Sequence, residues 1–195
     1  SNVENVQSAA QSIIADKNIH ILINNTGGPA GGSITDASTE AFESAFQMHV
    51  VCNQILAQAV TPGMKTDGFG RMVNIISTSV KIPIAGLGVS NTIRGAVASW
   101  AKTMANELGQ FGITVNNVLP GFTDTNRLKS LITKKAENQR VSEEQIANRM
   151  KNQIPAARFA QAEEVANAAA FLCSPAAAYI NGINVPVDGG RTGAL

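Results

Sequence analysis

Three short polar segments in this sequence carry side chains suited to holding a small polar ligand. They are Asn24-Asn25-Thr26-Gly27, Ser77-Thr78-Ser79 and Pro120-Gly121-Phe122-Thr123, and each follows an apolar run. Their amide and hydroxyl groups donate and accept hydrogen bonds. Ser90 and Arg94 are four residues apart, a spacing that places both on one face of a helix. These residues suit a cofactor site, but they are equally typical of ordinary turns after strands, and both interpretations stay open.

Thiol and metal chemistry are not indicated. Cys52 and Cys173 are far apart and have no C-x-x-C or histidine neighbours, so we expect two buried thiols in a reducing cytosol. His20 and His49 are the only histidines, and no zinc-ligand spacing includes them, so we expect no metal site. His49 lies among apolar residues, where a histidine is often structural. If His49 is not buried, a pKa of about 6.5 would suit it to proton transfer.

An alternation of predicted helices and strands positions these residues. Apolar strands are predicted at residues 19–23, 71–76, 114–119 and 183–187. Helices are predicted from a capping box at Ser1-Asn2-Val3-Glu4 and at residues 39–60, 90–108 and 162–172, with a charged helical insert at 129–151. This order indicates an α/β fold with a parallel sheet covered on both faces. Right-handed crossovers bring the carboxyl ends of the strands, and the three polar segments, to one edge of the sheet, where such folds bind ligands.

The bulk composition is that of an ordinary globular domain. A chain of 195 residues with 44% hydrophobic and 15% charged residues predicts one domain, residues 1–195. The net charge of +1 indicates neither a nucleic-acid partner nor a membrane surface. No apolar run has the length of a membrane span and no signal peptide is evident, so we expect a cytoplasmic protein.

Five motifs, taken in order, resemble those of the short-chain dehydrogenase/reductase family. Asn24-Asn25-Thr26-Gly27 resembles its N-N-A-G strand end, and residues 73–77 look like the strand that delivers its catalytic serine. Residues 112–121 are similar to the strand and P-G turn that close over the nicotinamide. Residues 154–172 and 179–190 resemble the family's "IP-x-x-R…P-E-E-[VI]…F-L" and "Y-I-T-G…V-D-G-G" stretches. The pattern is most similar to the 3-oxoacyl-[acyl-carrier-protein] reductase branch.

The resemblance implies a Rossmann-type doubly wound parallel sheet and hydride transfer between NAD or NADP and a carbonyl or alcohol. The implied substrate is a small carbonyl compound or an acyl thioester, and the implied assembly is a dimer or tetramer formed through the helices at 39–60 and 90–108. Carried over from the family, the catalytic residues are Ser77, Ser90, Arg94 and His49. The cofactor-binding residues are Asn25, Thr26, Gly27, Arg94, Pro120, Gly121, Thr123 and Thr125.

The sequence departs from the family pattern in two places. The T-G-x-x-x-G-x-G turn and the first β-α-β unit are not found in it, so we expect a longer native chain with about 60 further residues. The family's Y-x-x-x-K pair falls on Ser90 and Arg94, and its tetrad asparagine falls on His49. Arginine keeps the positive charge but is too basic to relay a proton. The proton would then come from Ser77, His49 or a water between them.

Other roles for these residues remain open. Ser90 is a good candidate for a helix N-cap, and Arg94 for a surface ion pair. The altered tetrad also leaves two other functions: a degenerate family member that binds a nucleotide or partner without catalysis, and a structural subunit whose sister chain performs the chemistry.

The predicted insert carries an unusual concentration of positive charge. Between residues 126 and 153 there are seven basic and three acidic residues, a net charge of +4 in a chain whose total is +1. A solvated helix face explains this simply. The resemblance also implies that this segment is a substrate lid, which would attract an anionic carrier such as acyl carrier protein or coenzyme A.

Overall fold

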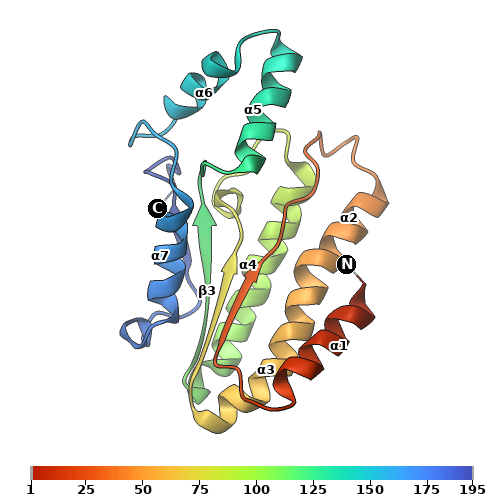
Figure 1. Cartoon of the computed structure of the whole chain (residues 1–195), viewed down its shortest axis with the longest axis vertical. Coiled ribbons are helices and arrows are strands. Elements are labelled where there is room, and N and C mark those ends of the chain that lie inside the picture. Colours follow the sequence, from red (N-terminus) through yellow and green to blue (C-terminus); the bar gives the residue numbers. More distant parts are fainter. Residues whose placement is uncertain (1, 195) are drawn as a thin grey trace.

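The structure, a computed structural model, describes residues 2–194, in which four strands form one parallel sheet. The strands are β1 (Ile21–Asn25), β2 (Gly70–Ile75), β3 (Ile113–Pro120) and β4 (Asn184–Val187), and they lie in the order β1-β2-β3-β4. All three strand pairs are parallel, so the carboxyl ends of the four strands share one edge, as the sequence predicts (Figure 1).

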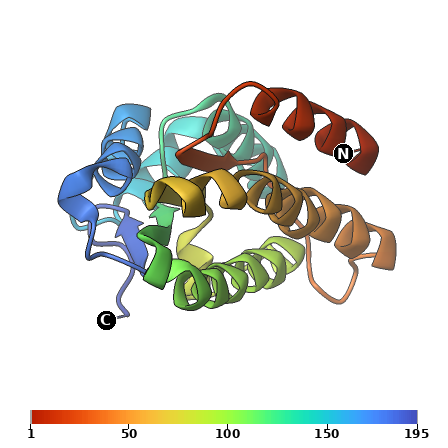
Figure 2. The ribbon, with the colours of Figure 1, turned by 90° about the horizontal axis from the view of Figure 1, so that it is seen from below.

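Helices cover both faces of the sheet. The longer ones are α1 (Val3–Ile14), α2 (Thr39–Phe46), α3 (Cys52–Asp67), α4 (Gly88–Leu108), α5 (Asn126–Gln139), α6 (Glu143–Lys151) and α7 (Ala162–Cys173). Short π or 3-10 turns are η1 (Gln47–Val51), η2 (Thr78–Val80), η3 (Gly109–Phe111) and η4 (Pro175–Ala177). Helices α3 and α4 pack on one face with α1 beyond α3, and α7 packs on the other face (Figures 1 and 2). Helices α5 and α6 extend beyond the carboxyl edge (Figure 1).

The core divides between the two faces because strand residues alternate in direction. Met72, Ile113 and Val115 pack with α3 and α4, whereas Val73 and Val118 pack with α7. All five side chains are at most 1% exposed, and burial of an aliphatic side chain of this size contributes about 1.5–3 kcal/mol. Because of this two-sided burial, nearly every residue of β2 and β3 is buried, including polar ones.

The edge strand β1 is less well covered. Ile21 and Ile23 are 47% and 49% exposed. Helix α7, which covers this face of the sheet, contacts β2, β3 and β4.

Within residues 2–194, no helix has the length and apolar character to cross a bilayer. In the same residues, no group of three or more His, Cys, Asp or Glu side chains could hold a metal ion.

Three element predictions need correction. The helix expected at 39–60 continues to Asp67 and contains the π turn η1 at its centre. The insert forms two helices, because Arg140 takes a left-handed conformation (φ 54°) and ends α5, and Ser142 then caps α6. Helix α1 is capped by Asn2, whose side chain accepts from the N–H of Asn5, and Ser1 lies outside the described residues.

Candidate active site

The three polar segments meet at the carboxyl edge, around a cavity of about 1060 Å³. Of the eleven residues predicted for the site, ten line this cavity: Asn25, Thr26, Gly27, Ser77, Ser90, Arg94, Pro120, Gly121, Thr123 and Thr125. The eleventh, His49, lines neither this cavity nor the second one described below.

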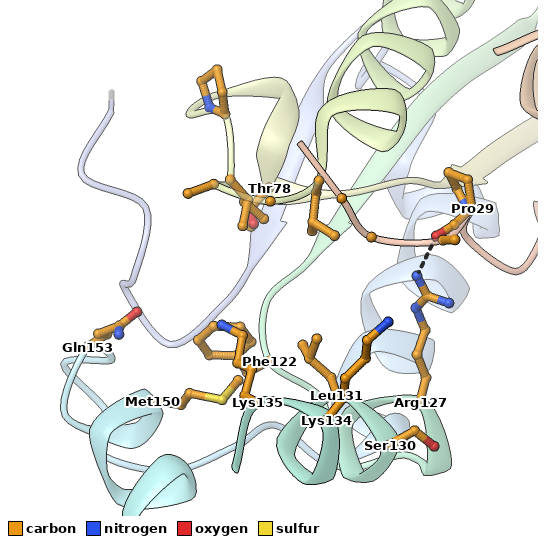
Figure 3. A pocket seen from close by; sticks show the side chains of 18 of the residues that line it. Pro29, Thr78, Phe122, Arg127, Ser130, Leu131, Lys134, Lys135, Met150 and Gln153 are labelled. Atoms are coloured by element: carbon orange, nitrogen blue, oxygen red, sulfur yellow. Dashed lines mark hydrogen bonds between the residues drawn. The ribbon is translucent and has the colours of Figure 1, made fainter. Parts of the chain in front are cut away.

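A second cavity of about 980 Å³ adjoins the first beneath α5. The two cavities share lining residues, among them Thr78, Phe122 and Arg127. Figure 3 shows side chains of α5 and Phe122 on one side of this second cavity, facing the segments that carry Pro29 and Thr78 on the other. The site is therefore a continuous hollow between the sheet edge and α5.

Ser77 stands where β2 turns into η2. Its Oγ accepts a hydrogen bond from the backbone N–H of Ser79 at 3.1 Å. Because the oxygen accepts in this contact, its O–H hydrogen remains free to donate to a ligand. Ser77 is half-buried and lines the cavity, which is the position a carbonyl-polarising group needs.

Ser90 is not a helix N-cap, contrary to the alternative considered above. Helix α4 already begins at Gly88, and Leu87 occupies the cap position with φ −127° and ψ 42°. The tight turn at Gly86, which has φ 75°, places this entry ahead of Ser90. Ser90 lies in the first helical turn, is 8% exposed and lines the cavity.

Arg94 is buried, so the surface ion-pair interpretation is wrong. Its side chain is 7% exposed and donates hydrogen bonds to the carbonyl oxygens of Ile75 (3.1 Å) and Thr26 (3.2 Å). Its Nε has no partner. Burial, followed by the nearby charge of Arg127, lowers the pKa of Arg94 to about 10. The guanidinium therefore stays charged at neutral pH.

His49 lies in η1 and is only 2% exposed. Its ring hydrogen-bonds the backbone of Gly27, and Nε2 is buried without a partner. Burial first, and the charge of Arg94 second, lower the pKa of His49 to about 4. The condition for proton transfer, an exposed imidazole with a pKa near 6.5, is therefore not met. His49 therefore contacts the backbone of the loop at Gly27 and does not line the cavity.

Four asparagines form a ladder across the sheet that sequence reasoning missed. Asn24 donates to Asn74, Asn74 to Asn117, and Asn117 to Asn184, each at 2.8 Å through side-chain amides. The three donor–acceptor pairs join residues in direct register. Asn24 and Asn74 stand next to the last residue of their strands, Asn117 lies within β3, and Asn184 begins β4. The ladder runs across all four strands and fixes their register.

Several basic side chains of the site were expected only as part of the charged insert, not as catalytic or cofactor-binding residues, and Arg191 was not expected at all. Arg127, Lys134 and Lys135 from α5 and Arg191 near the C-terminal end line one or both cavities. The guanidinium of Arg191 lies 4.3 Å from the ring centroid of Phe122. The helical spacing of 127, 131, 134 and 135 marks one face of α5 and was readable in advance. Neither cavity has Asp or Glu among its described lining residues.

The residues present fit the nicotinamide end of a dinucleotide. A Cβ atom on Gly27 would meet nothing within 4 Å, which leaves open space beside the backbone. Arg94 holds a charged donor group on the same cavity wall, with two of its five N–H donors used in bonds to carbonyls. A ribose, which carries hydroxyl acceptors, suits such a donor.

Comparison with known proteins agrees with this geometry. A family model described as enoyl-(acyl carrier protein) reductase matches residues 1–192. The chain is 33% identical over 172 residues to the 7alpha-hydroxysteroid dehydrogenase of Escherichia coli K12, covering 88% of this chain and 63% of that protein. It is 30% identical over 191 residues to a 3-oxoacyl-[acyl-carrier-protein] reductase of Vibrio cholerae, covering 97% of this chain and 74% of that protein.

Solved structures show the same fold. The L-sorbose reductase of Gluconobacter frateurii, complexed with NADPH and L-sorbose, matches with a TM-score of 0.92 and 28% identity, over 100% of this chain and 74% of that one. The chain thus spans 63% to 74% of the length of these three proteins. With its parallel sheet, its strand-end site and a family model matched over nearly its whole length, the chain belongs to the short-chain dehydrogenase/reductase family.

Proposed function

We propose that the protein is an NAD(P)-dependent oxidoreductase that reduces a carbonyl group, or oxidises the matching alcohol, in the cavity at the carboxyl ends of β1 to β3. The observation that carries this proposal is the convergence of Ser77, Ser90 and Arg94 on one cavity. Family membership and the names of relatives, which include a ketoacyl reductase and hydroxysteroid and gluconate dehydrogenases, support it.

Cofactor contacts are proposed for three parts of the cavity wall. Arg94 would hold the ribose hydroxyls next to the nicotinamide, and Asn25, Thr26 and Gly27 would line the groove beside it. The turn with Pro120, Gly121, Thr123 and Thr125 would hold the carboxamide. When bound, the nicotinamide supplies the hydride.

On the substrate, Ser77 would donate its free O–H hydrogen to the carbonyl oxygen, which polarises the carbonyl. The charge of Arg94, held in a site away from bulk water, would favour the negative charge that develops on that oxygen. Ser90 alone is a poor acid, Arg94 does not deprotonate, and His49 is buried and neutral. We therefore assign the proton to a water that reaches the oxygen past Ser77 and Ser90.

For the substrate, the resemblance favours a 3-oxoacyl thioester on acyl carrier protein or coenzyme A, with α5 and α6 as the lid. We further place the protein in the cytoplasm and expect a dimer or tetramer. The α2–α3 and α4 surfaces would form that assembly. Trp100 on α4 already ties to α3, because its Nε1 donates to Gln54 at 2.7 Å.

A non-catalytic function is the second candidate, because the resemblance implies that Ser90 takes the position of the family's proton-donating tyrosine. An assay of full-length protein can distinguish the two functions, by measuring oxidation of NADPH or NADH in the presence of a panel of ketones and oxoacyl thioesters.

We expect turnover in the parent protein and its loss in Ser77→Ala. We also expect the pair Ser90→Tyr with Arg94→Lys to raise ketone reduction, by at least about tenfold, because a positioned general acid contributes about 10²–10⁴-fold. Cofactor binding without turnover in either form would favour the non-catalytic function.

A further inference from the structure

Two guanidinium groups approach each other at Gly28, on the loop after β1. A Cβ atom on Gly28 would lie 2.8 Å from Nη2 of Arg127 and 3.7 Å from Nη2 of Arg94. Arg94 comes from α4 and Arg127 from the start of α5, and both line the larger cavity. The bare backbone of Gly28 therefore leaves room for the guanidinium of Arg127, and the guanidinium of Arg94 reaches the same place at ordinary contact distance.

Neither guanidinium has a counter-ion in the part of the chain that the structure describes. Arg94 donates to the carbonyl oxygens of Ile75 and Thr26. Arg127 donates to those of Gly28 and Pro29, each at 3.2 Å. Carbonyl oxygens satisfy N–H groups but carry no net charge.

This arrangement is costly without a ligand. Like charges repel, and the repulsion grows as water is excluded. Arg94 is 7% exposed and its Nε has no partner, so its buried charge is only partly compensated. The lowered pKa of Arg94, caused by burial and then by Arg127, reports the same repulsion. An anionic group between the two side chains would remove it.

Positive charge continues from Arg127 along the cavity face of α5. Arg127, Leu131, Lys134 and Lys135 share this face, and Figure 3 shows their side chains on the cavity side of the helix, with Arg127 bonded to Pro29. The lining of the second cavity also includes apolar side chains outside α5, among them Ile82, Pro83 and Leu87. A ligand with an anionic end and an apolar or neutral body would suit both parts of this lining.

We propose that Arg94 and Arg127, with the bare backbone of Gly28, form an anion site that binds a carboxylate or phosphate group of the substrate, with Arg94 offering this anion the N–H donors that it does not give to the cofactor ribose. The substrate class is then an anionic carbonyl compound, with the reacting carbonyl at Ser77 and the anion held by the two arginines. Paired guanidinium groups suit such oxygens because each presents donors in a fork.

This assignment rests on the proposed carbonyl chemistry. Its support is position: Arg94 is one helical turn from Ser90, and Ser77 lines the same cavity. The same oxygen chemistry also occurs in the pyrophosphate of a dinucleotide, so the experiment must separate the two sources.

The first arm measures binding to this chain by calorimetry, with oxalate and inorganic phosphate as probes and neutral oxamide as the comparison. We expect oxalate or phosphate to bind and oxamide not to bind. Arg127→Gln should weaken anion binding by about 10–100-fold, the equivalent of one lost charge-assisted hydrogen bond. Arg149→Gln is the matched control, because Arg149 sits on α6, bonds to Gln139 on the surface and lines neither cavity. It should bind as the parent chain does.

The second arm uses full-length protein with saturating NADPH and compares an oxo acid with its methyl ester. We expect the acid to be preferred, and the preference to fall about tenfold or more in Arg127→Gln, with the KM for NADPH unchanged. A raised KM for NADPH with an unchanged acid-to-ester ratio would assign the anion to the cofactor and overturn the proposal. Failure of both probes to bind would overturn it as well. If no carbonyl is turned over while oxalate binding still depends on Arg127, the proposed reduction fails and the anion site stands.

Discussion

At the scale of single residues, Arg94 is the charged group best placed to bind a ligand in the cavity. It is charged, nearly fully buried, and anchored to the ends of β1 and β2 through the carbonyls of Thr26 and Ile75. A lysine, with a single ammonium group, could not span both carbonyls in the same fixed way. If this is the position of the family's lysine, as the resemblance implies, an arginine there keeps the positive charge and also braces the two strand ends.

Arg94→Ala should weaken NAD(P)H binding by full-length protein by about 1.5–3 kcal/mol, the range for a lost charge-assisted hydrogen bond. Calorimetric dissociation constants measure this directly. Thermal melting of the same variant reports whether the loss of the brace also destabilises the fold, and Arg149→Gln serves as the control. A dissociation constant equal to that of the parent protein would remove Arg94 from the cofactor site.

His49 predicts a pH dependence of stability. Its pKa in the folded chain is about 4, below the usual value of 6.5. Between these values the unfolded chain binds a proton that the folded chain does not, so the free energy of unfolding should fall as pH drops from 6.5 to 4. Denaturant unfolding across this pH range measures the fall.

The comparison variant is His49→Asn, which removes the titrating group and introduces the residue that the resemblance implies for this position. In that variant the slope of stability against pH between 6.5 and 4 should be shallower. Identical slopes in both proteins would mean that His49 titrates as an ordinary exposed histidine.

At the scale of elements, hydrophobic periodicity predicted the strands and most helices well, because the central strands β2 and β3 are buried on both faces and the helices bury one face. The signals that failed are local. Ser90 has the residue type of an N-cap, but the turn at Gly86 starts the helix earlier. Arg140 ends α5 in a left-handed conformation for which the sequence offers no glycine. The register of the asparagine ladder depends on strand pairing, which a single sequence does not display.

Helix α5 carries the prediction that belongs to this scale. If its cations recruit a carrier, full-length protein should prefer a carrier-linked 3-oxoacyl substrate to a free ketone of equal length. Electrostatic attraction of this kind acts on the association rate and is screened over about 8 Å at physiological salt. The preference should therefore shrink as salt rises.

The double variant Lys134→Glu, Lys135→Glu should reduce that preference further at low salt, with kcat on the free ketone measured alongside. Both lysines line the second cavity, whereas Lys129 on the same helix does not, so Lys129→Glu is the matched control. Equal rates on free and carrier-linked substrates at low salt would leave α5 as an ordinary solvated helix.

At the scale of the whole molecule, the sheet, its crossovers and the ladder bring ten of the predicted site residues to one cavity. That convergence could be predicted, because parallel strands share one carboxyl edge. The meeting of Arg94 with Arg127 could not, since it depends on how α5 folds back over Gly28. The burial of His49 likewise depends on the π turn η1, which carries His49 inside the fold.

The central claim is hydride transfer in this cavity, and isotope transfer tests it most directly. Full-length protein should be incubated with a carbonyl substrate and NADPH or NADH that carries deuterium at C4 of the nicotinamide. The account predicts that the wild-type protein and the double variant Ser90→Tyr, Arg94→Lys form an alcohol with one deuterium on the carbinol carbon. The variant Ser77→Ala should not form this deuterated alcohol. Two results would contradict it: an alcohol product that contains no deuterium, whichever of the two C4 hydrogens of the cofactor is labelled, or a cofactor that binds and is never oxidised.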